Sequence, residues 1–197
     1  MMDAIDKTLG ILRTFSDPYE GWNQIVDVCI SEEPGVPWAS LPILNINAEI
    51  KTAKEWVIEN LDPQSSELGI YLGLDTLNMK NGEGKNILIG FLTDPKIDYS
   101  TEQWVYDSNI DYGTDFLLKG LYELKRIYSL PEWRSVSRLC DYVFFLGYSG
   151  IVLTRVFEQL ESKQRLHPVW GFHDGDMFTL GHLEHGIFKR AIGYAST

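Results

Sequence analysis

Cysteine is scarce in this sequence, and the two cysteines that occur do not suggest a disulfide framework. The chain of 197 residues contains only Cys29 and Cys140, and each lies in an apolar stretch. Small secreted domains that rely on disulfides usually contain more cysteines. Free cysteine is among the most buried residue types, so we expect both thiols to lie in the core. The same scarcity excludes a zinc knuckle built from pairs of cysteines.

Segments that would direct the chain into a membrane are also lacking. The first residues carry neither a basic region nor an apolar region, so the sequence predicts no signal peptide. The longest uninterrupted apolar runs are far shorter than the roughly 20 residues needed to cross a bilayer. We therefore expect a cytoplasmic protein that does not bind membranes.

Two glycine-containing stretches lack the spacing of catalytic motifs. Gly82-x-Gly84-Lys85 does not have the spacing of a phosphate-binding loop, and an expected strand follows it, so we interpret it as a hairpin turn. Ser149 lies between an expected strand and an expected helix, as a nucleophilic serine does in hydrolases. The Gly-x-Ser-x-Gly pattern is incomplete, however, because position 151 is isoleucine. We expect Ser149 to cap a helix instead.

Basic residues are few compared with acidic ones. The chain has 28 Asp and Glu against 17 Lys and Arg, a formal net charge of −11. Residues 1–100 hold 16 acids and 7 bases, and so carry −9 of this charge. Negative charge repels phosphate backbones and anionic lipids, which disfavours direct nucleic-acid binding. The same charge would attract a basic protein partner.

The pattern of apolar residues predicts one α+β domain over residues 1–197. At about 150 residues per domain, the length favours a single domain. Several stripes of apolar residues have helical spacing, for example Trp22, Ile25 and Cys29. The apolar runs 68–74 and 87–92 flank a turn and predict an antiparallel hairpin, and 142–146 is a further strand candidate. Hairpins argue against a purely parallel sheet, so we expect a mainly antiparallel sheet with about six helices.

Residues 94–115 combine acidic and aromatic side chains, with a single lysine among them. Aromatic side chains anchor protein interfaces, and surface charges steer the partner toward them. We predict that eight residues of this stretch bind a partner: Asp94, Asp98, Glu102, Trp104, Tyr106, Asp107, Asp111 and Asp115. A solvated acidic loop is the alternative interpretation. The ligand spacing of an EF-hand calcium loop is absent.

All four histidines lie within 19 residues near the C-terminal end: His167, His173, His182 and His185. The Asp-Gly pair at 174–175 predicts a tight hairpin turn, because both central residues of such a turn need a positive φ. In the hairpin that follows from this turn, His173 faces Asp176 and His167 faces His182.

This hairpin offers two kinds of site. Opposed side chains lie about 5 Å apart, so His167 and His182, with His185 as a third ligand, are candidates for a zinc site that keeps one position open for water. Asp176 is a candidate to orient His173 for acid–base catalysis. Structural histidines are the simpler alternative.

Two functions remain open from the sequence. The first is an acidic inhibitor that binds a basic partner, most concretely a bacterial immunity protein that neutralises a toxin or enzyme domain. The second is an enzyme, zinc-dependent or His/Asp-based, with its site in the C-terminal hairpin. An enzyme needs these histidines to converge on a pocket, whereas an inhibitor needs an exposed acidic face. We favour the inhibitor and assign it no catalytic residue and no cofactor.

Overall fold

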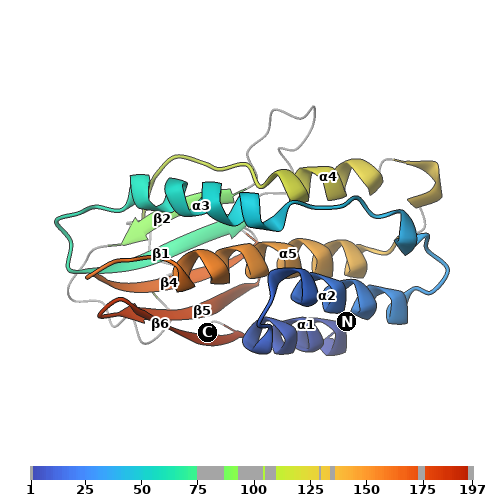
Figure 1. The fold of residues 1–197 in the computed structure, drawn as a ribbon, viewed down its shortest axis with the longest axis horizontal. Coiled ribbons are helices and arrows are strands. Elements are labelled where there is room, and N and C mark those ends of the chain that lie inside the picture. The colour runs from blue at the N-terminus through green and yellow to red at the C-terminus, as the bar shows by residue number, and fades with distance from the viewer. Residues whose placement is uncertain are drawn as a thin grey trace.

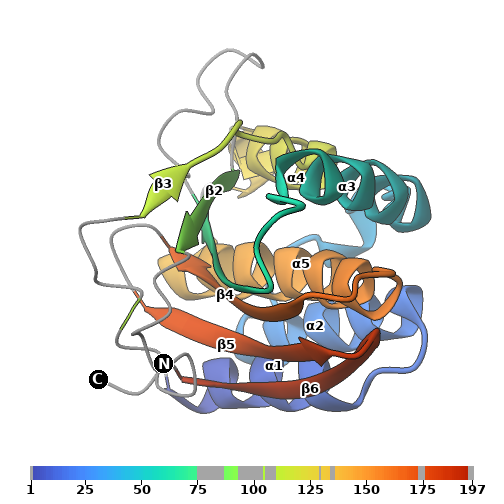
Figure 2. The same cartoon turned by 90° about the vertical axis from the view of Figure 1, so that its left-hand side faces the viewer.

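The fold is a six-stranded sheet with helices packed against one of its faces (Figure 1 and Figure 2). The computed structural model describes residues 2–74, 87–92, 104, 110–128, 130–133, 136–172 and 176–194. The strands are β1 Glu67–Leu74, β2 Ile87–Leu92, β3 Asp111–Tyr112, β4 Arg165–Phe172, β5 Met177–Glu184 and β6 Ile187–Tyr194. They lie in the order β3-β2-β1-β4-β5-β6. The predicted α+β class is confirmed.

Strand β1 lies in the middle of the sheet and has one antiparallel and one parallel neighbour. It pairs antiparallel with β2, with Leu72 opposite Ile89, which confirms the predicted hairpin. It pairs in parallel with β4, with Leu72 opposite Trp170. A parallel neighbour requires a long crossover connection, which here includes two helices of the chain between β3 and β4. The sheet is therefore mixed, and the expectation of a mainly antiparallel sheet was slightly wrong.

Five α-helices occur in the described ranges, where the sequence pattern predicted about six. They are α1 Met2–Thr14, α2 Pro18–Glu32, α3 Ile46–Asn60, α4 Lys119–Tyr128 and α5 Arg138–Glu158. The described residues also include the short 3-10 helices η1 Trp38–Ser40 and η3 Pro131–Trp133. The strand predicted at 142–146 and the helix predicted after it form one continuous helix, α5.

Polar side chains set the start of three helices. Asp17 caps α2, Asn45 caps α3 and Ser137 caps α5, each accepting a hydrogen bond from a backbone amide of the first turn. The cap at Asn45 agrees with the start of α3 at Ile46.

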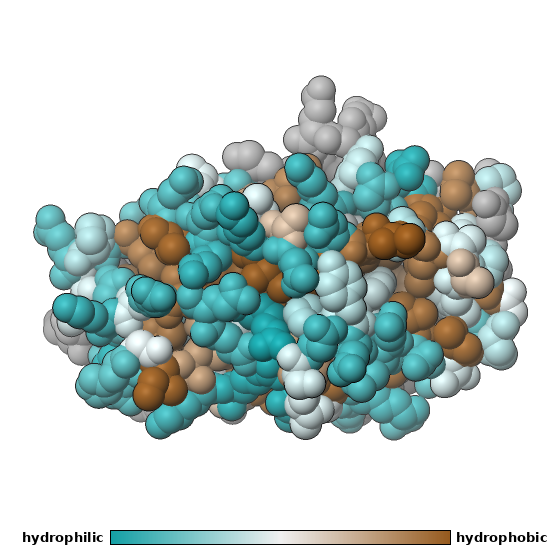
Figure 3. Space-filling model, viewed as in Figure 1, coloured by the Kyte–Doolittle hydropathy of each residue, from teal (hydrophilic) through white to brown (hydrophobic). Residues whose placement is uncertain are grey.

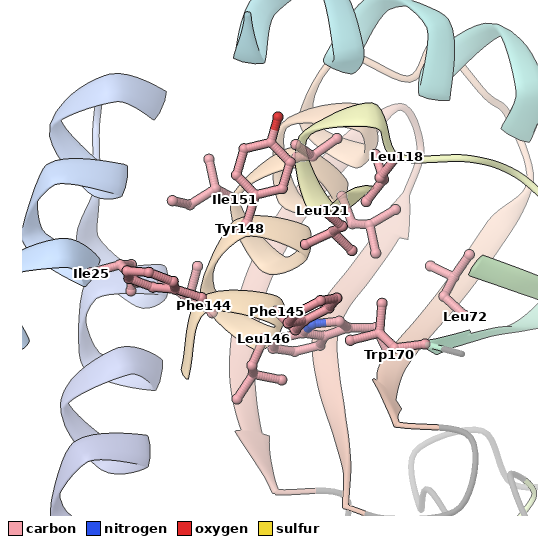
Figure 4. Packing of buried hydrophobic residues seen from close by; sticks show 14 of the residues in the cluster. Ile25, Leu72, Leu118, Leu121, Phe144, Phe145, Leu146, Tyr148, Ile151 and Trp170 are labelled. Atoms are coloured by element: carbon pink, nitrogen blue, oxygen red, sulfur yellow. The ribbon is translucent and has the colours of Figure 1, made fainter. Parts of the chain in front are cut away.

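Helix α5 is surrounded by protein, and fifteen of its 21 residues are buried. It packs against α1, α2 and α3 on one side and contacts β5 and β6 on the other. Figure 4 shows Phe144 directed toward Ile25 of α2, whereas Phe145 lies on the side of Trp170 of β4. A helix that contacts protein all round has no polar face. Ser149, expected as a cap, lies inside α5, where its hydroxyl donates to the Phe145 carbonyl.

Two glycines let the neighbouring helices approach α5 closely. A Cβ atom at Gly147 would lie 2.8 Å from the Ile25 side chain of α2, and one at Gly150 would lie 2.6 Å from Leu12 of α1. Both distances are shorter than real Cβ contacts allow. These glycines, which break the apolar pattern in the sequence, are therefore packing positions of a helix.

By length and composition, α5 is the one helix of the described chain that has the character of a membrane span. Its most apolar window is 78% buried inside the fold. The core helix of a soluble protein has this same combination of hydropathy and burial, and the packing of α5 between the sheet and the other helices agrees with that assignment.

Candidate functional site

The acidic stretch predicted to bind a partner is placed only in part. Asp111 lies exposed on the edge strand β3, and Asp115 is half-buried. Trp104 is 3% exposed and packs in a small cluster with Tyr71, Val169 and Met177 on the sheet face opposite the helices. Its role as an exposed partner anchor was therefore predicted wrongly, since its ring is already occupied within the fold. The other five residues lie outside the described residues: Asp94, Asp98, Glu102, Tyr106 and Asp107.

The structure does not bring the three candidate zinc ligands together. His167 pairs with Glu67 of β1, with 2.9 Å between its Nε2 and the glutamate Oε1. His182 lies opposite Lys189 of β6, and the side chain of His185 is 86% exposed in the turn between β5 and β6. Among the residues that the structure describes, no three His, Cys, Asp or Glu side chains are grouped so that they could hold a metal ion. The predicted set of His167, His182 and His185 is thus corrected.

The hairpin itself forms, but its register differs from the predicted one near the turn. Trp170 lies opposite Phe178, whereas the tight-turn register would place it opposite Thr179. The pairing shifts between Leu166 and Val169, at the position where His167 was expected to face His182. A bulge of this kind adds a residue to one strand and redirects its side chains.

The proposed acid–base pair in the turn stays a prediction. His173 lies outside the described residues. Its expected partner Asp176 is exposed and accepts a hydrogen bond of 3.1 Å from the Tyr142 hydroxyl of α5.

A pocket that the sequence did not predict lies between α3, α4 and α5. Its volume is about 550 Å³, within the range of small-molecule binding pockets. Its lining combines apolar walls with a few polar groups: Ile43, Leu44, Asn45, Ala48, Glu49, Thr52, Phe116, Leu117, Lys119, Gly120, Glu123 and Tyr148. The most unusual of these is Glu49, a carboxylate that is only 7% exposed.

Glu49 is held by hydrogen bonds from two other helices. Its Oε1 accepts from the Gly120 amide of α4 at 3.0 Å, and its Oε2 accepts from the Tyr148 hydroxyl of α5 at 2.8 Å. Gly120 lies in the first turn of α4, where backbone amides have no partner within the helix. The Glu49 side chain, on α3, is thus the hydrogen-bond acceptor for a backbone amide at the start of α4. Figure 4 shows the Tyr148 hydroxyl pointing out of the apolar cluster, toward α3.

The environment of Glu49 and Tyr148 raises the pKa of both side chains. Burial raises the pKa of Glu49, and the hydrogen bonds from Tyr148 and from the Gly120 and Lys119 backbone oppose this shift. Burial and the neighbouring Glu49 carboxylate raise the pKa of Tyr148 far above its usual range, so its hydroxyl keeps its proton. A buried carboxyl with a raised pKa on the wall of a pocket is a feature of functional sites. It is also compatible with a structural role in capping α4.

One signal in the sequence could have located Glu49. It falls inside the buried stripe of α3, beside Ile46, Ile50 and Ala53, at helical spacing. Charged residues are almost never fully buried unless they are paired. An acid inside an apolar stripe therefore indicates a polar partner from another element.

The stability of the Glu49→Gln variant relative to the wild type is expected to increase as the pH rises. Burial raises the pKa of Glu49 above its ordinary value of 4.5, so folding favours the protonated form. Its contribution is fully present below the unfolded pKa and is lost as the pH rises through the folded pKa. The free energy of unfolding of Glu49→Gln, minus that of the wild type, should increase from about pH 4 to about pH 7 in urea titrations. The exposed control Glu59→Gln should show no such increase, and a flat difference for Glu49→Gln would refute the assignment.

The segment that contains the first three helices carries most of the net charge. Residues 3–62, which include α1, α2 and α3, contain eleven acids and four bases, a net charge of −7. Exposed carboxylates on these three helices are Asp3, Asp6, Glu20, Asp27, Glu32, Glu55 and Glu59. On this side the surface is mainly hydrophilic, with separate hydrophobic patches (Figure 3). An acidic surface therefore exists on the helical layer, independently of the 94–115 stretch.

Comparison with known proteins identifies no relative. No protein-family model, curated protein or solved structure matches the chain.

Proposed function

We propose that this protein is an acidic inhibitor that binds a basic protein partner, in the manner of a cytoplasmic bacterial immunity protein that neutralises a toxin or enzyme domain. The observation that carries the proposal is the negative charge of the segment with α1, α2 and α3. Residues 3–62 contain eleven acidic and four basic residues. An acidic surface accelerates encounter with a basic protein and disfavours acidic competitors. The exposed Asp111 on the edge strand β3 and the half-buried Asp115 that follows it add two further carboxylates.

The helical surface offers contacts besides charge. Ile43 is fully exposed, and Tyr19 and Ile58 are 37% and 50% exposed. Interfaces usually combine a few apolar anchors with a polar, charged rim. Exposed apolar side chains beside carboxylates therefore favour a specific protein partner over non-specific binding of cations by negative charge alone.

Affinity capture from the native host tests the proposal. The wild-type protein and a variant carrying Asp6→Asn, Asp27→Asn, Glu55→Gln and Glu59→Gln serve as baits at low and at high salt. All four side chains are exposed, and surface substitutions of this kind usually change stability by about 0.5 kcal/mol or less. We expect one stoichiometric basic protein on the wild-type bait at low salt, weaker retention at high salt, and little retention on the variant.

A matched control separates loss of negative charge from loss of any charge. Lys51→Gln removes an exposed positive charge from α3 and should retain the partner at least as well as the wild type. If the captured protein is acidic, or if the fourfold variant retains it fully, the proposal is wrong. Inhibition is then tested on the captured protein, whose activity should fall when the wild type is added at equal concentration.

A further inference from the structure

The pocket between α3, α4 and α5 has three charged groups, Glu49, Lys119 and Glu123, in a mainly apolar wall. Leu44, Ala48 and Phe116 are among the residues that form its apolar lining, and Glu49 supplies a carboxylate. Ile43, whose side chain is fully exposed, lines the same pocket. A long side chain with a methylene stem and a charged head would match both parts of this lining.

We propose that this pocket receives a lysine side chain of the basic partner, with the ammonium group bound by Glu49 and the stem lying against the apolar wall. The inference rests on the proposed function, and it adds the anchoring residue of the partner. A carboxylate can accept about four hydrogen bonds. Tyr148 and Gly120 take one on each oxygen, and the Lys119 backbone also bonds to the carboxylate. An acceptor position is left for a cation.

The hydrogen bonds around Glu49 favour lysine over arginine. Arginine binds a carboxylate best through two parallel hydrogen bonds, one to each oxygen. Both oxygens of Glu49 are already engaged on separate sides by α4 and α5. The compact ammonium of lysine needs only a single accessible oxygen.

Two charged groups besides Glu49 line the pocket. Glu123, a second carboxylate in the lining, is bonded to the Arg126 guanidinium at 2.9 Å, so it is neutralised locally. Lys119, whose side chain is exposed, also lines the pocket, and its positive charge favours the ionised form of Glu49. Glu49, held in place by three groups of the protein, is therefore the fixed charge of the site.

Nuclear magnetic resonance titration of the isotope-labelled protein tests this proposal with defined probes. Nα-acetyl-lysine N-methylamide is compared with the norleucine analogue, which has the same stem without the ammonium, and with the arginine analogue. We expect the lysine probe to shift the amide signals of Ala48 and Gly120 and to bind about tenfold more tightly than norleucine, as loss of one charge-assisted hydrogen bond implies. Glu49→Gln should weaken lysine binding about tenfold, whereas Glu59→Gln should leave it unchanged.

A second variant keeps the test decisive if Glu49→Gln folds poorly. Ala48 is exposed at the pocket, so Ala48→Trp should fill the pocket without disturbing the core and abolish the amide shifts. Equal binding of lysine and norleucine, equal binding of lysine and arginine, or no shift at Ala48 and Gly120 would overturn the proposal. Such a result leaves the charge-dependent capture of a basic protein untouched. Lysine binding without any basic partner would instead remove the proposed function alone.

Discussion

Replacing Phe144 by alanine is expected to lower the free energy of unfolding by about 3–5 kcal/mol, the usual cost of removing a buried aromatic ring. Phe144 is fully buried in α5. Its ring lies 5.1 Å from that of Trp22 in α2 and 5.4 Å from that of Trp38 in η1. The substitution leaves a cavity where three elements meet, and alanine's better helix propensity offsets less than about 1 kcal/mol. Urea unfolding followed by circular dichroism measures the change.

The control for this prediction is Ile58→Ala in α3. Ile58 is 50% exposed, so its replacement should cost much less than that of Phe144. If 142–146 were an exposed strand, Phe144→Ala would cost about as little as Ile58→Ala. A loss below about 1 kcal/mol for Phe144→Ala would therefore contradict the central position of α5.

Replacing Arg190 by leucine is expected to lower the free energy of unfolding by about 2–4 kcal/mol, because several polar groups lose their partner at once. Arg190 of β6 has a side chain that is 17% exposed and bonds to Glu158 of α5. It also donates to the Phe15 carbonyl at 2.8 Å and to the Leu12 carbonyl at 3.3 Å, at the end of α1. Its guanidinium lies 4.2 Å from the Phe15 ring centroid. Arg190 thus joins α1, α5 and the edge of the sheet.

The neighbouring position gives a matched control on the same strand. Lys189 is exposed, so Lys189→Leu should change stability by about 0.5 kcal/mol or less. A double-mutant cycle with Glu158→Gln should show coupling between positions 158 and 190. Equal effects of Arg190→Leu and Lys189→Leu would show that the ion pair does not hold these elements together.

The parts of the fold that follow one clear period could be predicted from the sequence. The stripe from Trp22 to Cys29, at helical spacing, predicted α2. Two apolar runs around a turn predicted the β1–β2 hairpin. In α2 a single face is buried, so the pattern of apolar residues reports the helix directly. Strand β1 is buried on both faces, and its short apolar run next to a turn indicated a strand.

Helix α5 could not be predicted in this way, because its pattern has no period. The run at 142–146 contains aromatic and β-branched residues, which are typical of strands. Buried helices and buried strands share such continuous apolar runs. The helix is favoured by its tertiary contacts with α1, α2, α3 and the sheet. These contacts join segments that are far apart in the sequence, so a local pattern does not reveal them.

The candidate site was missed for a related reason. Glu49, Gly120 and Tyr148 come from three helices. Gly120 is 71 residues and Tyr148 is 99 residues away from Glu49 in the sequence. No spacing rule connects such positions. The histidines, by contrast, are close in sequence, yet the bulge in the β4–β5 pairing and the turn at His185 direct them to different surroundings.

The most direct measurement of the central claim is the affinity of the captured basic protein for the purified chain as a function of salt. Titration calorimetry compares the wild type with the fourfold variant Asp6→Asn, Asp27→Asn, Glu55→Gln and Glu59→Gln. We predict that wild-type affinity falls as salt rises, that the variant binds at least about tenfold more weakly at low salt, and that the two converge at high salt. Equal affinities for both proteins at every salt concentration would contradict the claim that the acidic helical surface binds the partner.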